Sequence, residues 1–298
     1  MPGLICHRVT SVIKSFMLEK ITPLVLTYNE APNIERTLRQ LVWAKRIVVI
    51  DSFSTDETLE ILKSFPQVQV FQRKFDTAAN QDNYGLQQVS TEWVLSLDAD
   101  YVLTDELVEE IKNLTAQDSI NAYWVKFKYC VFGKPLRKTL YPPRRVLYRR
   151  EKAIYEDDGH AHHVKVEGES AWFSSCILHD DRKSFSRWLS SQDRYMIREV
   201  EKFHQTPVRL LSLTDRIRRN KIFAPFVVLF YCLFWQKVIL DGWRGWYYAL
   251  QRVLAEIILA IRLIEKEKLS PQFDPPVLNQ VPAENLQERS SPILKDLN

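Results

Sequence analysis

Two carboxylates, Asp98 and Asp100, follow an apolar run at residues 93–97 that predicts a buried strand. Carboxylate oxygens are hard ligands that suit Mg²⁺ or Mn²⁺, and these ions often take further ligands from substrate phosphates. An Asp-x-Asp pair alone is a weak signal, because such tripeptides are common. Its position at the end of a buried strand strengthens it, and the sequence therefore predicts a divalent metal site at Asp98 and Asp100.

Two earlier apolar segments, 24–27 and 47–50, also predict strands that end in polar residues. Thr27 and Asn29 stand at the end of the first strand, and Asp51 follows the second. Ligands of parallel sheets bind beyond the carboxyl ends of the strands. Ordinary caps and turns explain any one of these residues, but three strand ends with this chemistry indicate one crevice.

Helices are predicted between the strands. A helix over 32–43 has Pro32 near its start, where proline is favoured. The S-x-x-E of 54–57 is typical of a capping box that opens a second helix, and a third helix at 77–89 follows a strand at 68–71. This alternation predicts an α/β fold with a mostly parallel sheet and helices on both faces.

The rest of the chain changes character. Segments 123–129, 145–149 and 171–178 predict strands that extend the sheet with mixed pairing, and His179 directly follows the last of them. The final third is helical and begins with an amphipathic segment at 184–203. We expect four parts, listed by residue range: an unstructured extension (1–16), the sheet domain (17–205), a helical membrane-associated region (206–268) and a disordered tail (269–298).

The helical region contains a run of 14 apolar residues at 222–235. A membrane-spanning helix needs about 20, so we favour an interfacial or re-entrant segment. Tryptophans and tyrosines cluster nearby, as they do at membrane interfaces, and an amphipathic helix at 246–264 follows. The alternative is a helical hairpin that packs on the sheet or forms a dimer interface.

Basic residues gather in two stretches. Residues 137–152 hold seven basic residues and one acid, and residues 182–221 hold eleven basic residues and four acids. Such stretches suit an anionic partner such as phospholipid or a phosphorylated substrate, although a solvated basic face is the alternative. No nucleic-acid motif is present, and we expect no nucleic-acid partner.

Composition excludes several other kinds of site. Seven glycines and no Gly-rich phosphate loop mean that a nucleotide would have to be held by side chains and a metal ion. The four cysteines lie far apart without a C-x-x-C pair. This argues against a disulfide framework or a zinc site and favours a reducing compartment.

Four segments between about residues 21 and 115 stand out by their order and spacing: Thr27-Tyr28-Asn29-Glu30, residues 51–58, Gln81 with Asn83, and Leu97-Asp98-Ala99-Asp100. Together they closely resemble the successive motifs of family 2 inverting glycosyltransferases. A second set, Asp158-Gly159-His160 with residues 178–183 and Arg187-Trp188, resembles the lipopolysaccharide-core glucosyltransferase subgroup. The resemblance implies a GT-A (Rossmann-like) fold.

The resemblance also implies roles. Asp100 would be a direct metal ligand and Asp98 would lie near the ribose and the metal, with His179 either a third ligand or a capped strand-end histidine. The catalytic base would be a carboxylate, with Glu156 a candidate and Asp157 or Asp158 favoured. The remaining nucleotide-sugar ligands would be Thr27, Asn29, Glu30, Asp51, Gln81 and Asn83.

The implied activity is metal-dependent, inverting sugar transfer from a nucleotide-sugar, with a UDP-sugar favoured. The acceptor would be a lipid-linked or lipopolysaccharide-type glycan at the cytoplasmic face of the cell membrane. The alternative is a non-catalytic membrane-associated scaffold with a degenerate site. A nucleotidyltransferase on a similar sheet would normally have a Gly-rich, basic loop after the first strand. Residues 28–32 are neither rich in glycine nor basic.

Overall fold

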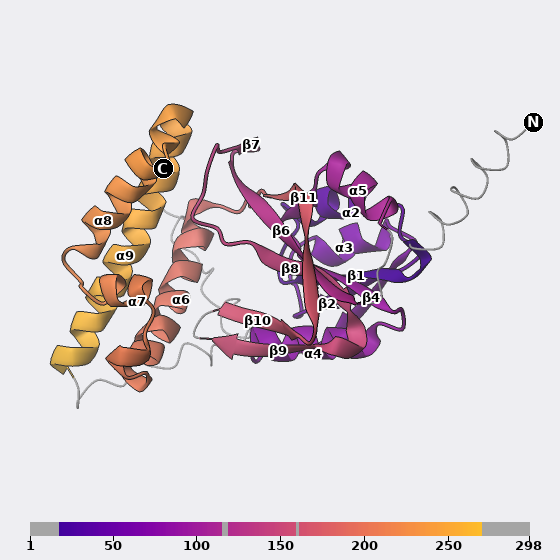
Figure 1. Ribbon diagram of the computed structural model, residues 1–298, viewed down its shortest axis with the longest axis horizontal. Coiled ribbons are helices and arrows are strands. Elements are labelled where there is room, and N and C mark those ends of the chain that lie inside the picture. The colour runs from indigo at the N-terminus through magenta and orange to yellow at the C-terminus, as the bar shows by residue number, and fades with distance from the viewer. Residues whose placement is uncertain (1–17, 115–118, 159–160, 270–298) are drawn as a thin grey trace, which may run out of the picture.

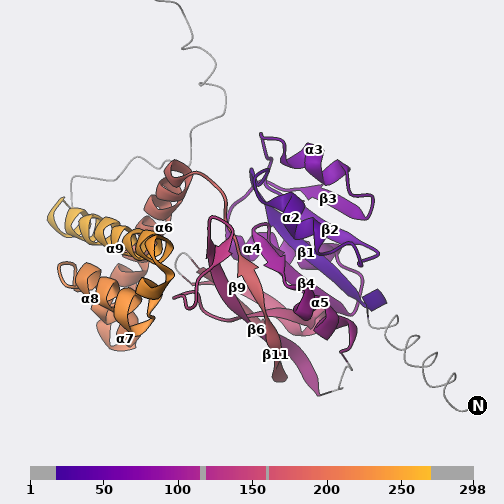
Figure 2. The same cartoon turned by 90° about the horizontal axis from the view of Figure 1, so that it is seen from above.

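The structure is a computed structural model that describes residues 18–114, 119–158 and 161–269; at 157–158 and 161–162 it describes the backbone alone. The expected extension at 1–16 and the tail from residue 270 onward lie outside the described residues. A layer of helices from the C-terminal part of the chain stands beside one large sheet (Figures 1 and 2).

In chain order the elements are β1 (Ile21–Thr27), α2 (Ile34–Arg39), β2 (Ile47–Asp51), α3 (Thr58–Lys63), β3 (Val68–Gln72), α4 (Ala78–Gln88), β4 (Trp93–Asp98), β5 (Tyr101–Leu103), α5 (Asp105–Lys112), β6 (Ile120–Val131), β7 (Lys134–Pro135), β8 (Arg144–Arg149), β9 (Ala153–Asp158), β10 (Ala161–Val166), β11 (Glu169–His179), α6 (Phe185–Gln205), α7 (Leu213–Arg218), α8 (Ala224–Phe230), a π-helical turn (Tyr231–Trp235) and α9 (Trp243–Leu269). Short 3₁₀ turns lie at Arg150–Lys152, Val208–Leu210 and Val238–Asp241.

The strand order of the main sheet is β3-β2-β1-β4-β8-β6-β11-β5. The first four strands pair in parallel, as the sequence predicts. The remainder is mixed, because β8 is antiparallel to both β4 and β6 whereas β6 and β11 are parallel. The predicted extension of the sheet with mixed pairing is therefore confirmed, and β9 and β10 form a separate hairpin.

The core explains the apolar strand sequences. All five residues of β2 are buried, since helices cover both faces of the sheet. One apolar cluster joins the sheet to α2, α3 and α5 through residues such as Leu38, Leu62 and Leu107. The opposite cluster joins it to α4 and β9 through Leu86 and Tyr155. The fold is thus a mixed α/β sheet with helices on both faces, as the sequence predicts.

Two predictions of helix starts were wrong. The helix expected from Pro32 begins at Ile34, because the backbone N–H groups of Asn33 and Ile34 both donate to the Glu30 carbonyl, at 2.8 and 2.9 Å, in a turn. The helix ends at Arg39, and the residues from there to the predicted end at residue 43 form turns. The capping box also fails. The Ser54 hydroxyl is bonded to a buried carboxylate, and Glu57 precedes α3 without a side-chain cap hydrogen bond. The Thr58 backbone N–H at the start of the helix instead donates to the Asp56 carboxylate at 3.0 Å.

The C-terminal helices form a layer of their own, in which α6 and α9 run side by side (Figures 1 and 2). Arg218 of α7 connects them, because its guanidinium contacts Glu199 of α6 at 2.7 Å and Glu256 of α9 at 3.0 Å. In the part of the chain that the structure describes, no helix is both long enough and apolar enough to cross a membrane. The apolar run at 222–235 is divided between α8 and the π-helical turn.

Candidate active site

A cavity of about 460 Å³ opens beyond the carboxyl ends of β1, β4 and β11. The structure thus brings the predicted strand ends together at one crevice. Six of the predicted site residues line this cavity, which we call the donor cavity: Thr27, Glu30, Gln81, Asp98, Asp100 and His179. Asp51, Asn29 and Asn83 do not line it.

Asp51 lies beneath the donor cavity and is 0% exposed. Its carboxylate accepts hydrogen bonds from the Thr27 hydroxyl at 3.1 Å, the Ser54 backbone N–H at 2.9 Å and the Gln72 amide at 3.2 Å. A buried polar group satisfied in this way fixes the positions of its donors. Asp51 therefore holds the end of β1 against the loop after β2, and its direct contact with a nucleotide stays a prediction.

Asn29 fastens the same loop. Its backbone has a φ of 55°, in the left-handed region that asparagine tolerates better than most residues. Its side-chain oxygen accepts from the backbone N–H groups of Thr55 at 2.7 Å and Asp56 at 3.3 Å. Asn29 thus shapes the rim of the cavity from outside, and its predicted contact with the donor also stays a prediction.

Asn83 connects α4 to the β9–β10 hairpin. Its amide donates to the Tyr155 carbonyl at 3.0 Å and accepts from the Tyr155 backbone N–H at 2.9 Å. The backbone of Asp157 and Asp158 lies farther along β9, but their side chains lie outside the described part of the structure. Asn83 therefore supports the strand that carries the candidate bases rather than facing the cavity.

His179 and Asp100 are in direct contact. The imidazole Nε2 lies 3.2 Å from a carboxylate oxygen of Asp100, and the ring is surrounded edge-on by Tyr101, Tyr129 and Tyr141. Burial alone would raise the pKa of Asp100, but the adjacent His179 outweighs it and holds this pKa well below its usual range.

The predicted metal donors fit a divalent ion in type but do not converge. Two carboxylates and an imidazole line the same cavity, a donor set that suits Mn²⁺. The Asp98 carboxylate instead faces Arg144 at 3.8 Å. Within residues 18–114, 119–158 and 161–269, no three His, Cys, Asp or Glu side chains form a group that could hold a metal ion. An ion would therefore need ligands from the substrate.

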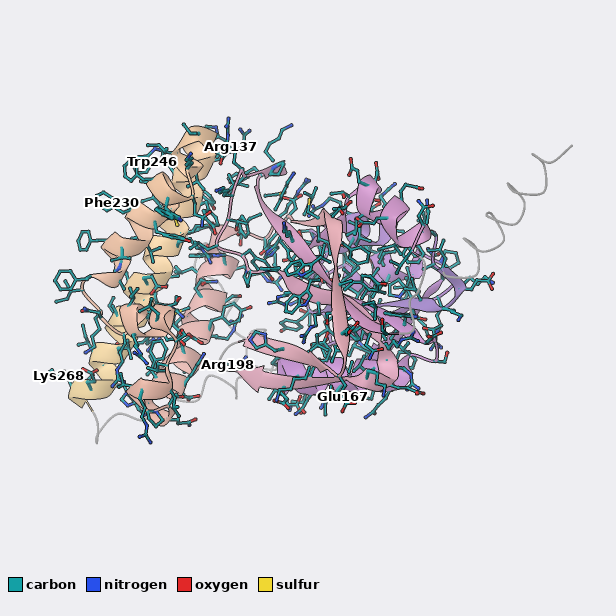
Figure 3. The ribbon with its side chains drawn as sticks, viewed as in Figure 1. Arg137, Glu167, Arg198, Phe230, Trp246 and Lys268 are labelled. Atoms are coloured by element: carbon teal, nitrogen blue, oxygen red, sulfur yellow. The ribbon has the colours of Figure 1, made fainter. Side chains whose placement is uncertain are left out.

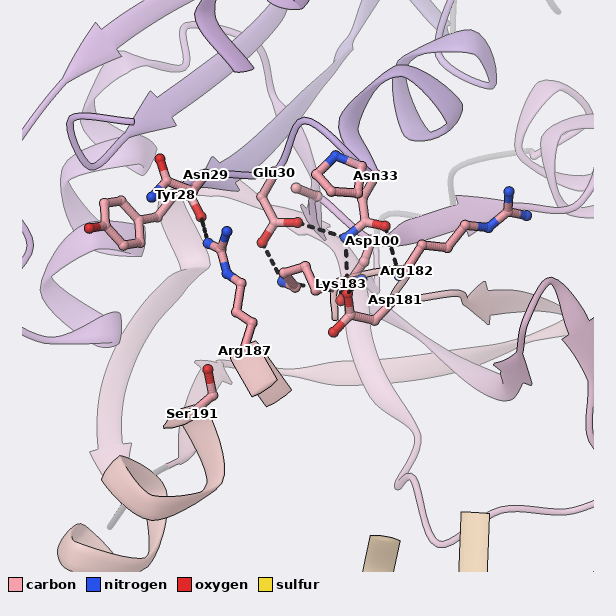
Figure 4. Close-up of polar contacts among 12 residues, drawn as sticks. Tyr28, Asn29, Glu30, Asn33, Asp100, Asp181, Arg182, Lys183, Arg187 and Ser191 are labelled. Atoms are coloured by element: carbon pink, nitrogen blue, oxygen red, sulfur yellow. Dashed lines mark hydrogen bonds and ion pairs between the residues drawn. The ribbon is translucent and has the colours of Figure 1, made fainter. Parts of the chain in front are cut away.

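Glu30 is half-buried and forms an ion pair with Lys183, as Figure 4 shows. The ammonium lies 2.6 Å from one carboxylate oxygen, and Asn33 donates to the other at 2.9 Å. Burial raises the pKa of Glu30 to about 6, although Lys183 opposes the shift. Lys183 thus enters the donor cavity already paired with a carboxylate from the β1 end.

Other cations line the donor cavity and were not assigned a role by residue number: Arg144, Arg187, Arg198 and Arg252. The first three belong to the two basic stretches of the sequence, and Arg187 is also part of the second set of motifs in the family resemblance. Arg187 also donates to the Tyr28 carbonyl at 2.8 Å, so that α6 is fastened to the end of β1. Arg252 comes from α9, and no sequence pattern pointed to it.

Comparison with known proteins agrees with this geometry. Residues 24–166 match the family model described as glycosyl transferase family 2. These residues are therefore similar to a family 2 glycosyltransferase domain over just under half of the chain. The matched segment includes the strand ends at Thr27, Asp51 and Asp98 and extends to the end of β10. It does not include His179 or the helical layer, and membership of the lipopolysaccharide-core subgroup is not confirmed.

Curated relatives share only this part of the chain. An uncharacterized glycosyltransferase of Rickettsia bellii is 31% identical over 118 residues, which are 38% of this chain and 40% of the relative. One of Rickettsia typhi is 30% identical over 144 residues, 46% of this chain and 49% of the relative. The chain therefore spans less than half the length of these relatives.

Solved structures are more distant. Residues 1–349 of Staphylococcus aureus TarS, crystallised with UDP-GlcNAc, are 16% identical and cover 86% of this chain and 93% of that chain, with a TM-score of 0.44.

Proposed function

We propose that this protein is an inverting glycosyltransferase that takes its sugar from a nucleotide-sugar, with a UDP-sugar favoured. The observation that carries the proposal is the donor cavity of the family 2 domain. Its carboxylates, Asp98 and Asp100, lie among cationic side chains that suit a diphosphate. No Gly-rich loop is present to bind the phosphates through backbone N–H groups, so side chains must do so.

Asp98 and Asp100 would hold a divalent cation, Mn²⁺ or Mg²⁺, with His179 as a third donor. Such an ion stabilises the negative charge that builds on a leaving diphosphate. Arg144 and Lys183 contribute to the same end, because both line the cavity as cations that are already oriented by Asp98 and Glu30.

The catalytic base would be Asp157 or Asp158, with Glu156 as the third candidate. A carboxylate there would take the proton from the attacking acceptor hydroxyl, and direct displacement would invert the anomeric carbon. Support comes from the double hydrogen bond of Asn83 to Tyr155, which holds β9 at a fixed place beside α4.

The acceptor would be a lipid-linked or lipopolysaccharide-type glycan at the cytoplasmic face of the cell membrane. Large apolar side chains are exposed on α8, the π-helical turn and α9, among them Phe230 at 64% and Trp235 at 73%. Figure 3 shows Phe230 and Trp246 on the side of the helical layer that faces away from the sheet. Exposed aromatics beside cations such as Lys237 and Arg244 suit an anionic membrane surface.

Calorimetric titration of UDP into the full chain, with and without Mn²⁺, tests the donor part. We expect metal-dependent binding that Asp100→Ala abolishes. No binding of UDP, dTDP or GDP under any metal condition would instead favour a non-catalytic protein with a degenerate site. Sedimentation with phosphatidylglycerol vesicles at low salt tests the membrane part separately, and failure to sediment with them would count against that part alone.

A further inference from the structure

A second cavity, of about 480 Å³, adjoins the donor cavity at Asp98. The two cavities share five wall residues: Asp98, Tyr129, Tyr141, Arg144 and Arg252. The rest of the second cavity is built by β6, β8, the β9–β10 hairpin and the segment that leads into β8. A molecule in the second cavity would therefore lie beside a sugar donor, and one of its walls belongs to the strand that carries the candidate bases.

The walls of the second cavity are largely aromatic. Trp124, Tyr155 and Tyr248 join the shared tyrosines there. Aromatic walls with a few placed polar groups are typical of sites for small organic ligands, and flat ring faces pack well against the C–H faces of sugars. The cavity thus has the lining expected of a glycan subsite.

The charges of the second cavity are mostly positive. Its described lining includes three arginines, Arg144, Arg145 and Arg252, but Asp98 is its only carboxylate. Asp98 already faces Arg144 at 3.8 Å. Arg145 and Arg252 therefore remain without a carboxylate partner in the lining.

Both remaining arginines keep an unused donor. The Nε groups of Arg145 and Arg252 are buried, and neither has a hydrogen-bond partner among the described residues. Arg145 lies over the Trp124 ring at 4.6 Å and Arg252 over the Tyr248 ring at 5.6 Å. These contacts hold the guanidinium planes without satisfying the Nε–H groups. A buried donor left unsatisfied is costly, and an anion in the cavity would offset part of that cost through its attraction to the guanidinium charge.

Neighbouring carboxylates do not act as counter-ions for these two arginines. Glu256 lies one helical turn beyond Arg252 on α9, but its carboxylate is bound by Arg218 at 3.0 Å. Among the residues that the structure describes, neither Arg145 nor Arg252 forms an ion pair. An arginine held in place without a counter-ion is well suited to bind a phosphate or carboxylate of a ligand.

We propose that the second cavity is the acceptor subsite and that it selects an acceptor sugar bearing a phosphate or carboxylate, which Arg145 and Arg252 bind. This inference rests on the proposed function, because an acceptor subsite requires a donor site beside it. It gives the helical layer a part in specificity, since Arg252 reaches the cavity from α9.

Calorimetry of the full chain saturated with UDP and Mg²⁺ tests the inference, with inorganic phosphate as the probe. Saturation fills the donor cavity, so that phosphate reports on the second one. We expect Arg145→Gln and Arg252→Gln each to weaken phosphate binding about tenfold. The matched control is Arg244→Gln, because Arg244 lies on the same helix and also has a buried, unbonded Nε, but lines neither cavity. We expect it to bind phosphate as the wild type does.

Three sugars then define the anion. Glucose 6-phosphate and glucuronate distinguish phosphate from carboxylate, and we expect at least one of them to bind about tenfold more tightly than neutral glucose. Arg252→Lys, which keeps the charge, should restore part of the affinity, and equal thermal unfolding midpoints exclude misfolding as the cause of any loss.

Two outcomes would overturn the inference: no phosphate binding by the UDP-saturated wild type, or undiminished binding by both Gln variants. Of the donor and second cavities, Arg145 lines only the second, so its variant also detects phosphate that has entered the donor cavity. If UDP does not bind but Arg145→Gln still weakens phosphate binding, the proposed donor function fails while the anion subsite stands.

Discussion

Lys183 and Glu30 form a close ion pair, 2.6 Å from nitrogen to oxygen, although 153 positions separate them in the chain. Glu30 belongs to the loop after β1, whereas Lys183 lies beyond β11 and outside the matched family 2 segment. The pair therefore connects two walls of the donor cavity. One wall belongs to the segment that matches the family model, and the other lies outside that segment.

This pair predicts an unusual pH dependence of stability. Burial raises the pKa of Glu30 from 4.5 to about 6, so between these values the folded state binds more protons than the unfolded state. This contribution to stability is fully present below about pH 4.5 and is lost as pH rises through about 6, at a cost of about 2 kcal/mol. Glu30→Gln mimics the protonated form and should remove this loss.

Denaturant unfolding of both proteins from pH 4.5 to pH 7.5 measures the effect. We expect Glu30→Gln to be the more stable protein at pH 7.5 by up to about 2 kcal/mol, and the difference to vanish near pH 4.5. A variant that is less stable than the wild type at pH 7.5 would show that the ionised pair stabilises the fold after all.

A second prediction concerns the charge that Lys183 brings to the donor cavity. Lys183→Gln should weaken metal-dependent UDP binding about tenfold and reduce its dependence on salt, because one cation beside the diphosphate is lost. Calorimetry at two salt concentrations measures both effects. Lys45→Gln serves as the control, since Lys45 is a largely exposed lysine that pairs with Glu19. Equal losses in both variants would contradict a local role.

A third prediction separates structure from binding at Asn83. Asn83→Ala removes two hydrogen bonds to the Tyr155 backbone, and it should destabilise the fold by about 2 kcal/mol while UDP affinity is retained. The control is Asn80→Ala on the same helix, where the lost bond to Asp76 is exposed and the change should stay below about 0.5 kcal/mol. Loss of UDP binding by folded Asn83→Ala would make Asn83 a nucleotide ligand, as the family resemblance implies.

The exposed apolar face of the helical layer supplies a fourth prediction. The double change of Phe230→Ser and Trp235→Ser should sharply reduce sedimentation with phosphatidylglycerol vesicles. Phe230 is 64% exposed and Trp235 is 73% exposed, so both apolar side chains are accessible to lipid. Val42→Ser is the control, since Val42 is 65% exposed on the sheet domain. If the double variant sediments as the wild type does, this face is not the one that contacts the membrane.

The strands and the crevice could be predicted from the sequence because their signals are local. A fully apolar run such as 47–50 has to be buried on both faces, and the polar residue that ends it stands at the edge of the sheet. The positions of Thr27, Asp98 and Asp100 beside one cavity follow from this logic together with the parallel strand order.

The failures came from contacts between distant segments. Ser54 fits a capping box by pattern, but in the fold its hydroxyl donates to the buried Asp51 carboxylate and accepts from the backbone N–H of Asn29 at 2.8 Å, across a chain separation of 25 positions. The same holds for Asn83, whose type and spacing suit a ligand although its amide is used by β9. Arg252 gave no signal, because its place beside the cavity depends on how the helical layer docks.

The Arg218 cluster has a consequence for how that layer assembles. The Arg218 guanidinium forms ion pairs with carboxylates from two other helices, Glu199 on α6 and Glu256 on α9. Packing of α6 on α9 without α7 would leave both carboxylates without their counter-ion, and such a state is strongly disfavoured. α6 and α9 should therefore pack together only when α7 is in place, and Arg252 would reach its cavity only once that step is complete.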